Sequence, residues 1–411
     1  MAGPSALGAI ELAPETAFAE TSTTFATDRV PVLGMVNCSG LTHAKEAPGR
    51  VEQYMHGGSQ HVLMGQGGSF EMEIDLAGHE ATTAGSPTLT TRETLLSYAI
   101  GNVALSAAAS TTFTGGTATV PTTTASGTIS AGGLIRSGVL GDGRGNGQFH
   151  AVSTHVTTNL TLLTGTDVAV NAADVLYPAA VIHTSETPSV GLDGTTLGLR
   201  FRLLTNGLQY ACHGCAITGT SFSGLNTGGR PKVKLTVAVA RWAAVSATFP
   251  SAVASSTANP SVVAAGSFFF AAVGTATRAT KAIRDFTLEY GSVVTPLMGP
   301  GGVGQYQTIV GYRRTPGPIT ISWVEDADTS PTATPVAQGY GTGTTSYHAL
   351  YTLSPNAGSS VGFYFPKLCV TNVPVQFDDG GINRMKVECA AYTGSTTTNN
   401  ITASALRMAF A

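Results

Sequence analysis

Two cysteines separated by two residues are the first candidates for chemistry in this chain. Cys212 and Cys215 enclose His213 and Gly214; cysteine and histidine are ligands that zinc prefers, and closely spaced thiols also serve redox reactions. The segment follows an apparent strand, in which residues three apart point to opposite faces, so the thiols would share one metal only if a turn intervenes. No second Cys or His pair at zinc-ribbon spacing accompanies them. The motif therefore favours two buried thiols at a strand end over a zinc or redox site.

The other motifs predict no catalytic set. Residues 299–305 (GPGGVGQ) are rich in glycine like a phosphate-binding loop, but Gln305 and Tyr306 stand where such a loop needs Lys and Ser or Thr. The nine histidines show no ligand spacing on a helix, and no serine lies in a nucleophile elbow. We therefore expect a protein that is not an enzyme and that holds no metal or other cofactor.

A stripe of carboxylates is the most informative polar feature. Residues 70–76 (FEMEIDL) alternate strictly, which predicts a strand with an apolar face and an acidic face that carries Glu71, Glu73 and Asp75. Neighbours on one face lie about 6.6 Å apart, within the screening length of about 8 Å at physiological salt, so the three charges repel each other. The stripe is either a solvated outer face or a wall that must not bind a passing polyanion, because Lys and Arg contacts with phosphates would slow its passage.

The elements that position these residues are predicted to be strands. The chain has 411 residues, of which 50 are Gly and only 11% are charged, and it is poor in helix formers. A net charge of −3 does not favour a protein that grips nucleic acid. We expect no membrane helix, because no apolar run reaches the roughly 20 residues needed to span a bilayer, and no secretory signal, because the first residues are acidic rather than basic.

The sequence also contains an internal repeat. Residues 215–242 and 368–394 each carry an apolar residue followed by Thr, then a Gly-Gly turn, then an alternating strand with charged residues on one face. The paired positions include Thr218 with Thr371 and Lys234 with Lys386. A repeat of turn, alternation and charge predicts two related β units in one chain.

Breaks in composition predict the boundaries of these units. We expect an N-terminal arm over residues 1–28, a first β domain over 29–246, a linker over 247–265 and a second β domain over 266–411. Within the first domain, Thr90 and Glu93 form a capping box that predicts one short helix. Residues 103–147 are rich in Ala, Ser, Thr and Gly, which indicates a long insertion loop, either a protruding hairpin or a segment that a neighbour holds.

Four segments in order carry a family resemblance. They are residues 8–18 (GAIELAPETAF) with 30–32 (VPV), residues 68–74 (GSFEMEI) before the short helix, residues 215–223 (CAITGTSFS), and a weaker second round from 284–288 (RDFTL) to Val370 and Thr371. Taken together, the chain resembles the two-domain tail tube proteins, or major tail proteins, of long-tailed bacteriophages.

The resemblance implies a mainly β fold of two tandem, related β-sandwich or roll domains, with one short flanking helix in the first, that contribute strands to an oligomeric β-barrel. It implies a structural protein of the virion, assembled in the host cytoplasm, whose copies form rings that stack into the tail tube and conduct DNA during ejection. Trimeric rings of pseudo-sixfold symmetry are favoured, and hexameric rings are the alternative. The implied partners are other copies, the tape-measure protein and DNA in the lumen, and tail terminator and tail tip proteins, with no membrane.

The resemblance also assigns roles to particular residues. The residues implied to face the lumen are Glu71, Glu73, Asp75, Thr320 and Ser322. The last two stand where Glu71 and Glu73 would fall in the second domain, so a uniformly acidic lumen is not expected. The residues implied to contact the next ring are Glu11, Glu15, Phe18, Phe25 and Arg144.

Two other functions are compatible with the same composition. A capsid decoration protein or another β-rich head component shares the β-rich, Ser- and Thr-rich character, and only the tube subunit should form hollow rods. A secreted β-rich carbohydrate-binding module or hydrolase is the third hypothesis. The expected lack of a secretion signal and of paired carboxylates in a cleft argues against it, and loss of an activity on mutation of Cys212 would support it.

Overall fold

The fold is mainly β, as predicted. The computed structural model describes residues 9–16, 18–19, 25, 29–46, 62–79, 90–105, 111–124, 129–138, 147–166, 172, 174–184, 198–205, 208–245, 263, 267–276, 280–300, 307–326, 346–354, 359–372, 376–393 and 401–411. Strands dominate these ranges, which hold a single α-helix, α1 (Thr91–Ile100), and one short 3-10 helix, η1 (Ile401–Ala403).

Seven antiparallel strands form a first sheet. Its order is β2-β1-β13-β14-β15-β4-β3. The strands are β1 (Ala9–Pro14), β2 (Val30–Pro31), β3 (Leu41–Glu46), β4 (Val62–Asp75), β13 (Leu199–Thr205), β14 (Leu208–Ser223) and β15 (Lys232–Val245). The alternation predicted for residues 70–76 holds, since Phe70, Met72 and Ile74 are buried. β1 falls within the predicted arm, yet all six of its residues pair with β13, so this part of the arm is a strand of the sheet.

A second sheet contains seven strands in the order β17-β16-β20-β21-β23-β19-β18. These strands are β16 (Ser267–Ala272), β17 (Thr280–Lys281), β18 (Ile283–Pro300), β19 (Gln307–Asp326), β20 (Tyr347–Thr352), β21 (Val361–Val370) and β23 (Asn383–Ala391). Four further strands extend this sheet: β22 (Gln376–Asp378) on β23, β24 (Arg407–Phe410) on β21, β12 (Ala180–Thr184) on β24, and β5 (Gly101–Leu105) on β12.

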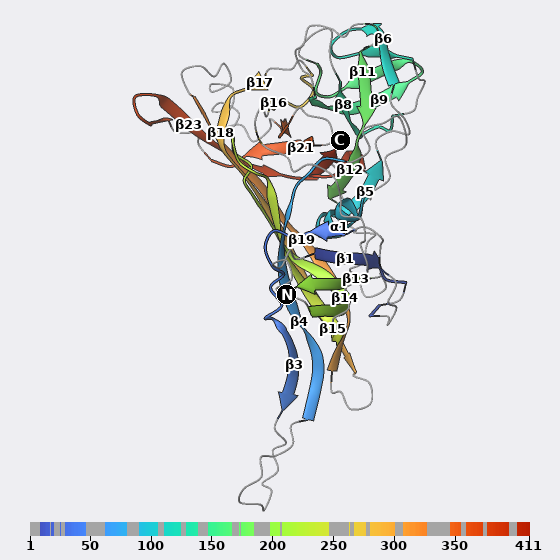
Figure 1. The fold of residues 1–411 in the computed structure, drawn as a ribbon. Coiled ribbons are helices and arrows are strands. Elements are labelled where there is room, and N and C mark those ends of the chain that lie inside the picture. Colours follow the sequence, from blue (N-terminus) through green and yellow to red (C-terminus); the bar gives the residue numbers. More distant parts are fainter. Residues whose placement is uncertain are drawn as a thin grey trace, which may run out of the picture.

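The two sets of seven strands follow the same path. In chain order, β16, β17, β18, β19, β20, β21 and β23 take the places in their sheet that β1, β2, β3, β4, β13, β14 and β15 take in the first. Both sheets are antiparallel throughout these pairs. In both, a long hairpin, β3–β4 or β18–β19, ends the order, and β3–β4 projects away from the rest of the molecule (Figure 1).

A closed barrel interrupts the first set of strands. Its order is β10-β7-β6-β11-β8-β9, and the strands are β6 (Thr111–Gly116), β7 (Pro121–Thr123), β8 (Leu134–Ser137), β9 (Phe149–Val156), β10 (Asn159–Leu162) and β11 (Val175–Pro178). Residues 103–147 were predicted to be a long insertion loop, either a protruding hairpin or a segment that a neighbour holds; the described residues of this range supply β6, β7 and β8, and β6 pairs with β7 as a hairpin. The pairs that close the barrel join strands far apart in the chain, as Asn159 of β10 pairs with Thr122 of β7 and β11 pairs with β6, so no local pattern reveals the closure.

The helix forms where the capping box predicts it. The Thr90 side chain accepts a hydrogen bond from the Glu93 backbone N–H, and the Glu93 carboxylate accepts one from the Thr90 backbone N–H. The same carboxylate lies 2.7 Å from Nδ1 of His79, and both side chains are buried. The helix ends at Gly101, which lies at φ 156°.

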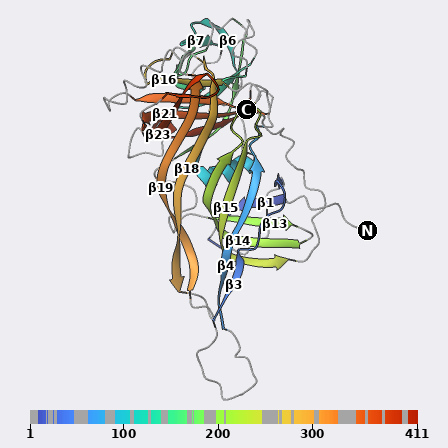
Figure 2. The same cartoon turned by 90° about the vertical axis from the view of Figure 1, so that its left-hand side faces the viewer.

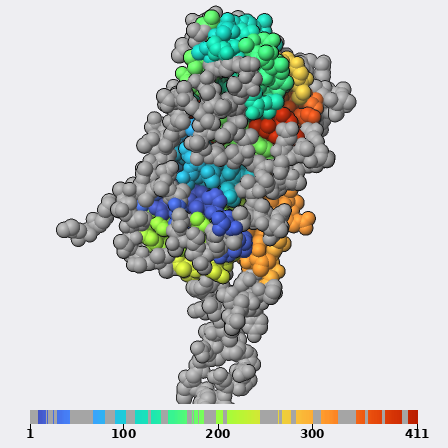
Figure 3. All heavy atoms as spheres, turned by 90° about the vertical axis from the view of Figure 1, so that its right-hand side faces the viewer, coloured from blue at the N-terminus to red at the C-terminus, as the bar shows by residue number. Residues whose placement is uncertain are grey.

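One hydrophobic core runs through both sheets. It includes Phe70 from the first sheet and Phe268, Trp323 and Phe363 from the second. The rings of Phe222 and Phe363 meet edge to face at 5.8 Å across the two halves. A separate cluster that includes Phe149 of β9 and Tyr364 of β21 packs the other side of the second sheet on the barrel. The barrel caps one end of the molecule, away from the first sheet (Figure 2, Figure 3).

Candidate assembly surfaces

The two cysteines of the Cys-His-Gly-Cys motif lie in the core. A bulge separates them, since Cys215 pairs with Leu199 and Cys212 with Phe201, so three steps on β14 match two on β13. Gly214 lies at φ +60°, which permits the bulge, and a side chain there would come within 2.8 Å of Ala240. The expectation that the thiols point to opposite faces is therefore wrong, because it assumed a regular strand.

Burial makes these thiols unreactive. It raises the pKa of both Cys212 and Cys215 above the usual value for a thiol. Among the described residues, no group of three or more His, Cys, Asp or Glu side chains could hold a metal ion. Both thiols are part of the hydrophobic core that joins the sheets.

The acidic stripe is matched by cations on and beside the neighbouring strand. Lys234 Nζ lies 2.9 Å from a Glu71 carboxylate oxygen, Lys232 Nζ lies 3.3 Å from that of Glu73, and Arg230 pairs with Asp75. The repulsion expected between the three carboxylates is therefore offset, because β15 and the residues just before it place one cation diagonally opposite each of them. We name these six side chains the charge ladder.

The corresponding polar face of β19 carries hydroxyl groups. The Ser322 hydroxyl lies 2.7 Å from that of Thr287, and the Thr320 hydroxyl donates to Glu289 at 3.2 Å. Both contacts join β19 to β18 on the face opposite the shared core. The five residues predicted to face a lumen thus lie on the polar sides of β4 and β19, and their role in a lumen stays a prediction.

The residues predicted to contact a neighbouring ring are engaged within the chain where they are described. Glu11 is 1% exposed and pairs with Arg29 at 3.1 Å and Arg202 at 2.8 Å. The buried carboxylate is thus compensated by one guanidinium from β13 and one from the residue before β2, the two strands on either side of β1, since an uncompensated buried charge is costly.

Three further residues of that set have contacts within the chain. The Glu15 carboxylate accepts from the backbone N–H of Gly214 at 2.7 Å. The Phe18 ring meets the Tyr312 ring edge to face at 5.9 Å, and the Arg202 guanidinium lies 4.3 Å from the centre of the Phe25 ring. Arg144 lies outside the described residues, and the inter-ring role of all five residues stays a prediction.

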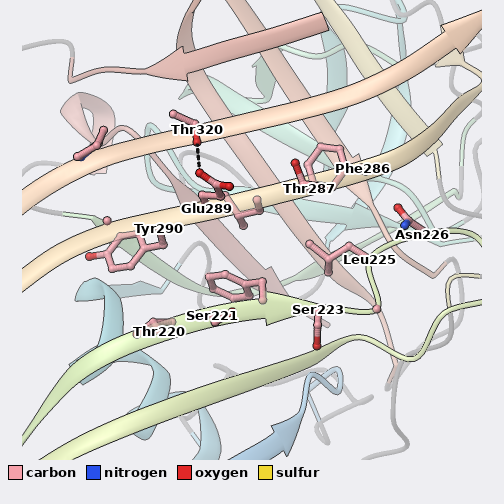
Figure 4. A pocket seen from close by; sticks show the side chains of 15 residues that line it. Thr220, Ser221, Ser223, Leu225, Asn226, Phe286, Thr287, Glu289, Tyr290 and Thr320 are labelled. Atoms are coloured by element: carbon pink, nitrogen blue, oxygen red, sulfur yellow. Dashed lines mark hydrogen bonds between the residues drawn. The ribbon is translucent and has the colours of Figure 1, made fainter. Parts of the chain in front are cut away.

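A groove of about 650 Å³ lies where the two sheets meet. Residues 220–226, at the end of β14 and in the turn after it, form one wall, and residues 286–291 of β18 form the other (Figure 4). Apolar side chains close its floor, since Phe222, Leu225 and Phe286 are nearly fully buried. Ser223 and Thr287 lie on opposite walls.

The groove exists because two strand edges are open there. β13 pairs with β14 only as far as Cys215, so the following part of β14 pairs on one side alone in the described residues. In the same ranges β18 pairs only with β19. The edges approach without a hydrogen-bonded ladder. Thr320 is the groove residue that the sequence singled out, though for a lumen; the groove itself was not predicted, because an open edge depends on where neighbouring strands end.

Other edges expose apolar side chains. Those with more than a third of their surface exposed include Met35 before β3, Val293, Met298 and Val310 on the β18–β19 hairpin, and Phe377, Ile382 and Tyr392 around β22 and β23. Open edges with apolar side chains are surfaces on which other chains bind. These exposed apolar side chains are therefore candidate contact surfaces.

Comparison with known proteins adds no assignment. The sequence matches no protein-family model and no curated protein. In the described part of the chain, no helix is both long enough and apolar enough to cross a membrane.

Proposed function

We propose that this protein is a structural virion subunit, the tail tube protein of a long-tailed bacteriophage, whose copies form rings that stack into a hollow tube. The observation that carries the proposal is the pair of sheets in which seven strands follow one path and leave open edges. Open edges must be covered or they drive uncontrolled association, and a closed ring of copies covers them.

Within this proposal, the chain holds two tandem, related β domains that each supply strands to an oligomeric barrel. The matched strand paths and the single core that joins the sheets support this organisation. A ring of three chains would then present six similar units, which is the symmetry that the resemblance to two-domain tail tube proteins implies. The barrel of β6 to β11 is an addition at the outer end of each chain.

The polar faces of β4 and β19 are proposed to line the lumen. The charge ladder carries three anions and three cations, so its net charge is zero. A DNA strand passing such a wall would meet cations that are already paired with carboxylates, and each phosphate contact would have to displace one. This modifies the acidic stripe expected on β4 from residues 70–76, while the function of low adhesion to DNA and the tape-measure protein is retained.

Negative-stain electron microscopy of the purified protein tests this function. Hollow rods of constant diameter, formed at raised protein concentration, are the expected result. Particles that remain single chains at every protein and salt concentration would contradict the proposal. Binding of single chains to phage heads would instead support a capsid decoration protein.

A further inference from the structure

The same threonine hydrogen bond occurs in both sheets and shows which of their residues correspond. The Thr218 hydroxyl donates to the Thr236 carbonyl at 3.2 Å, and the Thr371 hydroxyl donates to the Glu388 carbonyl at the same distance. Thr218 lies at a bulge in the pairing of β14 with β15, and Thr371 directly follows the last paired residue of β21. The sequence repeat pairs these same threonines. Thr236 therefore corresponds to Glu388.

Strand register extends this correspondence to the opposite edge. Thr236 pairs with Glu71, and Glu388 pairs with Ser322, so Ser322 rather than Thr320 takes the place of Glu71. Glu71 in turn bridges to Asn37, and Ser322 pairs with Thr287. Asn37 at the first sheet's edge thus corresponds to Thr287 in the wall of the groove. The preceding residues, Val36 and Phe286, are both buried, as the correspondence requires.

The same use of strand register identifies the counterpart of the other groove wall, which contains Ser223. Ser223 pairs with Lys232, and Phe377 pairs with Arg384. Lys232 precedes Thr236 on β15 by the same number of residues as Arg384 precedes Glu388 on β23, so Lys232 corresponds to Arg384. Their pairing partners, Ser223 and Phe377, therefore correspond as well. Ala216 and Cys369 correspond too, because they pair with Ala238 and Ala390 at equal distances from the same reference residues.

The contact between the halves uses one wall from each sheet. β14 of the first sheet faces β18 of the second across the groove, and beside it Tyr312 of β19 covers Ala216. The Tyr312 hydroxyl also donates to the Gly214 carbonyl at 3.0 Å. We call this contact the internal seam.

Each chain therefore carries a second pair of the same walls, and in the described residues no segment of the chain covers it. Phe377 is 42% exposed and Cys369 is exposed, although Ala216, the counterpart of Cys369, is only 3% exposed. At the opposite wall, Asn37 is exposed and Met35 beside it is 57% exposed. The wall around Cys369 and Phe377 corresponds to one that is buried in the first half. It should therefore be complementary to the other exposed wall, around Asn37, as the two walls of the groove are to each other.

We infer that copies of this chain join head to tail by repeating the internal seam: the wall around Cys369 and Phe377 of one copy receives the edge around Asn37 of the next. The contact is heterologous, so it continues from chain to chain until a ring closes. The β3–β4 hairpin then lies over the neighbour's second sheet, as β18–β19 lies over the first sheet of its own chain. The inference rests on the proposed function, for which it supplies the lateral contact of the rings.

Cysteine cross-linking tests the contact against a reference inside the molecule. Ser223→Cys with Thr287→Cys places one thiol on each wall of the internal seam, and Phe377→Cys with Asn37→Cys places them at the corresponding open walls. Both pairs are made with Cys38→Ser and Cys369→Ser, which remove the thiols near these walls. The shortest bismaleimide that links the reference pair within one chain is then applied to the second pair.

The expected result is a ladder of covalently joined chains for the second pair and none for the reference pair. A mixture of the single variants Phe377→Cys and Asn37→Cys should give dimers that neither variant gives alone. Dimers from one single variant, or single chains alone in a sample that contains rods, would overturn the inference and leave the tube proposal standing. Joined chains in a sample that never forms rods would support the seam and count against the tube.

The reactivity of Cys369 gives a second readout without changing the walls. Its thiol should react with Ellman's reagent at once in dispersed chains and at least about tenfold more slowly after assembly, because a neighbour then covers it as Tyr312 covers Ala216. Equal rates in the two states would overturn the inference even if the cysteine variants failed to fold.

Discussion

Ala216 in the first sheet lies under Tyr312, whereas Cys369 at the corresponding place in the second sheet is exposed. The two sheets share a strand path, so the difference comes from what covers them rather than from how they fold. The first sheet is completed by its own chain, since the β18–β19 hairpin reaches it. In the described ranges, no segment covers the corresponding wall of the second sheet, where Cys369 and Phe377 are exposed.

The polar faces differ in the same comparison. The first sheet carries the charge ladder, and the second carries hydroxyl contacts and the pair of Lys386 with Glu388 at 2.6 Å. Strand path and core are thus common to both sheets, while surface charge differs. This is expected if burial constrains the shared positions and solvent tolerates change at the others.

The largest effect should follow from Phe286→Ala at the internal seam. Its ring packs 4.5 Å from that of Tyr351 and 6.0 Å from that of Phe268, so its loss leaves a cavity in the core that joins the halves. We expect a loss of about 3–5 kcal/mol in the free energy of unfolding, measured by urea denaturation. Val36→Ala at the corresponding position should cost less, because fewer carbon atoms are removed.

The control lies on the same strand. Val293→Ala alters a side chain that is 61% exposed, so its effect should stay within about 0.5 kcal/mol. If Phe286→Ala were equally mild, Phe286 would not be packed in solution as it is in the structure, and the wall of the internal seam to which it belongs would lose its support.

A smaller but more selective effect should separate Ala216→Leu from Cys369→Leu. Ala216 has no room to grow beneath Tyr312, so leucine should destabilise the single chain by about 1–3 kcal/mol. Cys369 is exposed, and leucine there should change the stability of the single chain by less than about 0.5 kcal/mol. Rods should nevertheless fail to form from Cys369→Leu when they are counted by electron microscopy.

The outcome separates two explanations of the exposed position. Rods formed normally by Cys369→Leu would mean that no neighbour packs there. Cys369→Ala, which copies the first sheet, serves as the matched control and should assemble as the parent chain does.

Local patterns were sufficient for the elements that depend on neighbours in sequence. The alternation of residues 70–76 and the capping box of Thr90 and Glu93 predicted a strand and a helix that the structure contains. The paired threonines of the repeat make the same hydrogen bond. Each depends on contacts within one element or between adjacent strands.

Features that depend on distant pairing were missed. The barrel closes through short strands without clear alternation, and the bulge at Gly214 turns Cys215 into the core that Cys212 also occupies. The charge ladder could not be foreseen from the acidic strand alone, because nothing in residues 70–76 shows that β15 would be its neighbour. The groove likewise depends on where β13 ends.

The hydrogen bonds of Thr218 and Thr371 should contribute similarly in the two sheets. Thr218→Val and Thr371→Val each remove one hydroxyl donor with little change in the shape of the side chain. We expect losses of about 0.5–1.5 kcal/mol in urea denaturation, with the smaller value at the exposed Thr371. A loss at one site and a gain at the other would contradict the residue correspondence on which the seam depends.

The smallest effect is expected in the charge ladder, and its dependence on salt provides a further test. Lys234→Met removes the partner of Glu71 at a position where both side chains are more than a third exposed, so the loss of stability should be below about 1 kcal/mol. Raising NaCl to about 1 M, where the screening length falls to about 3 Å, should remove most of that difference. Lys386→Met is the matched change in the second sheet. Because Lys386 pairs with Glu388 on its own strand, Lys386→Met should cause no larger loss of stability than Lys234→Met. A loss above about 2 kcal/mol for Lys234→Met would mean that the charge ladder is less accessible to solvent than its exposure indicates.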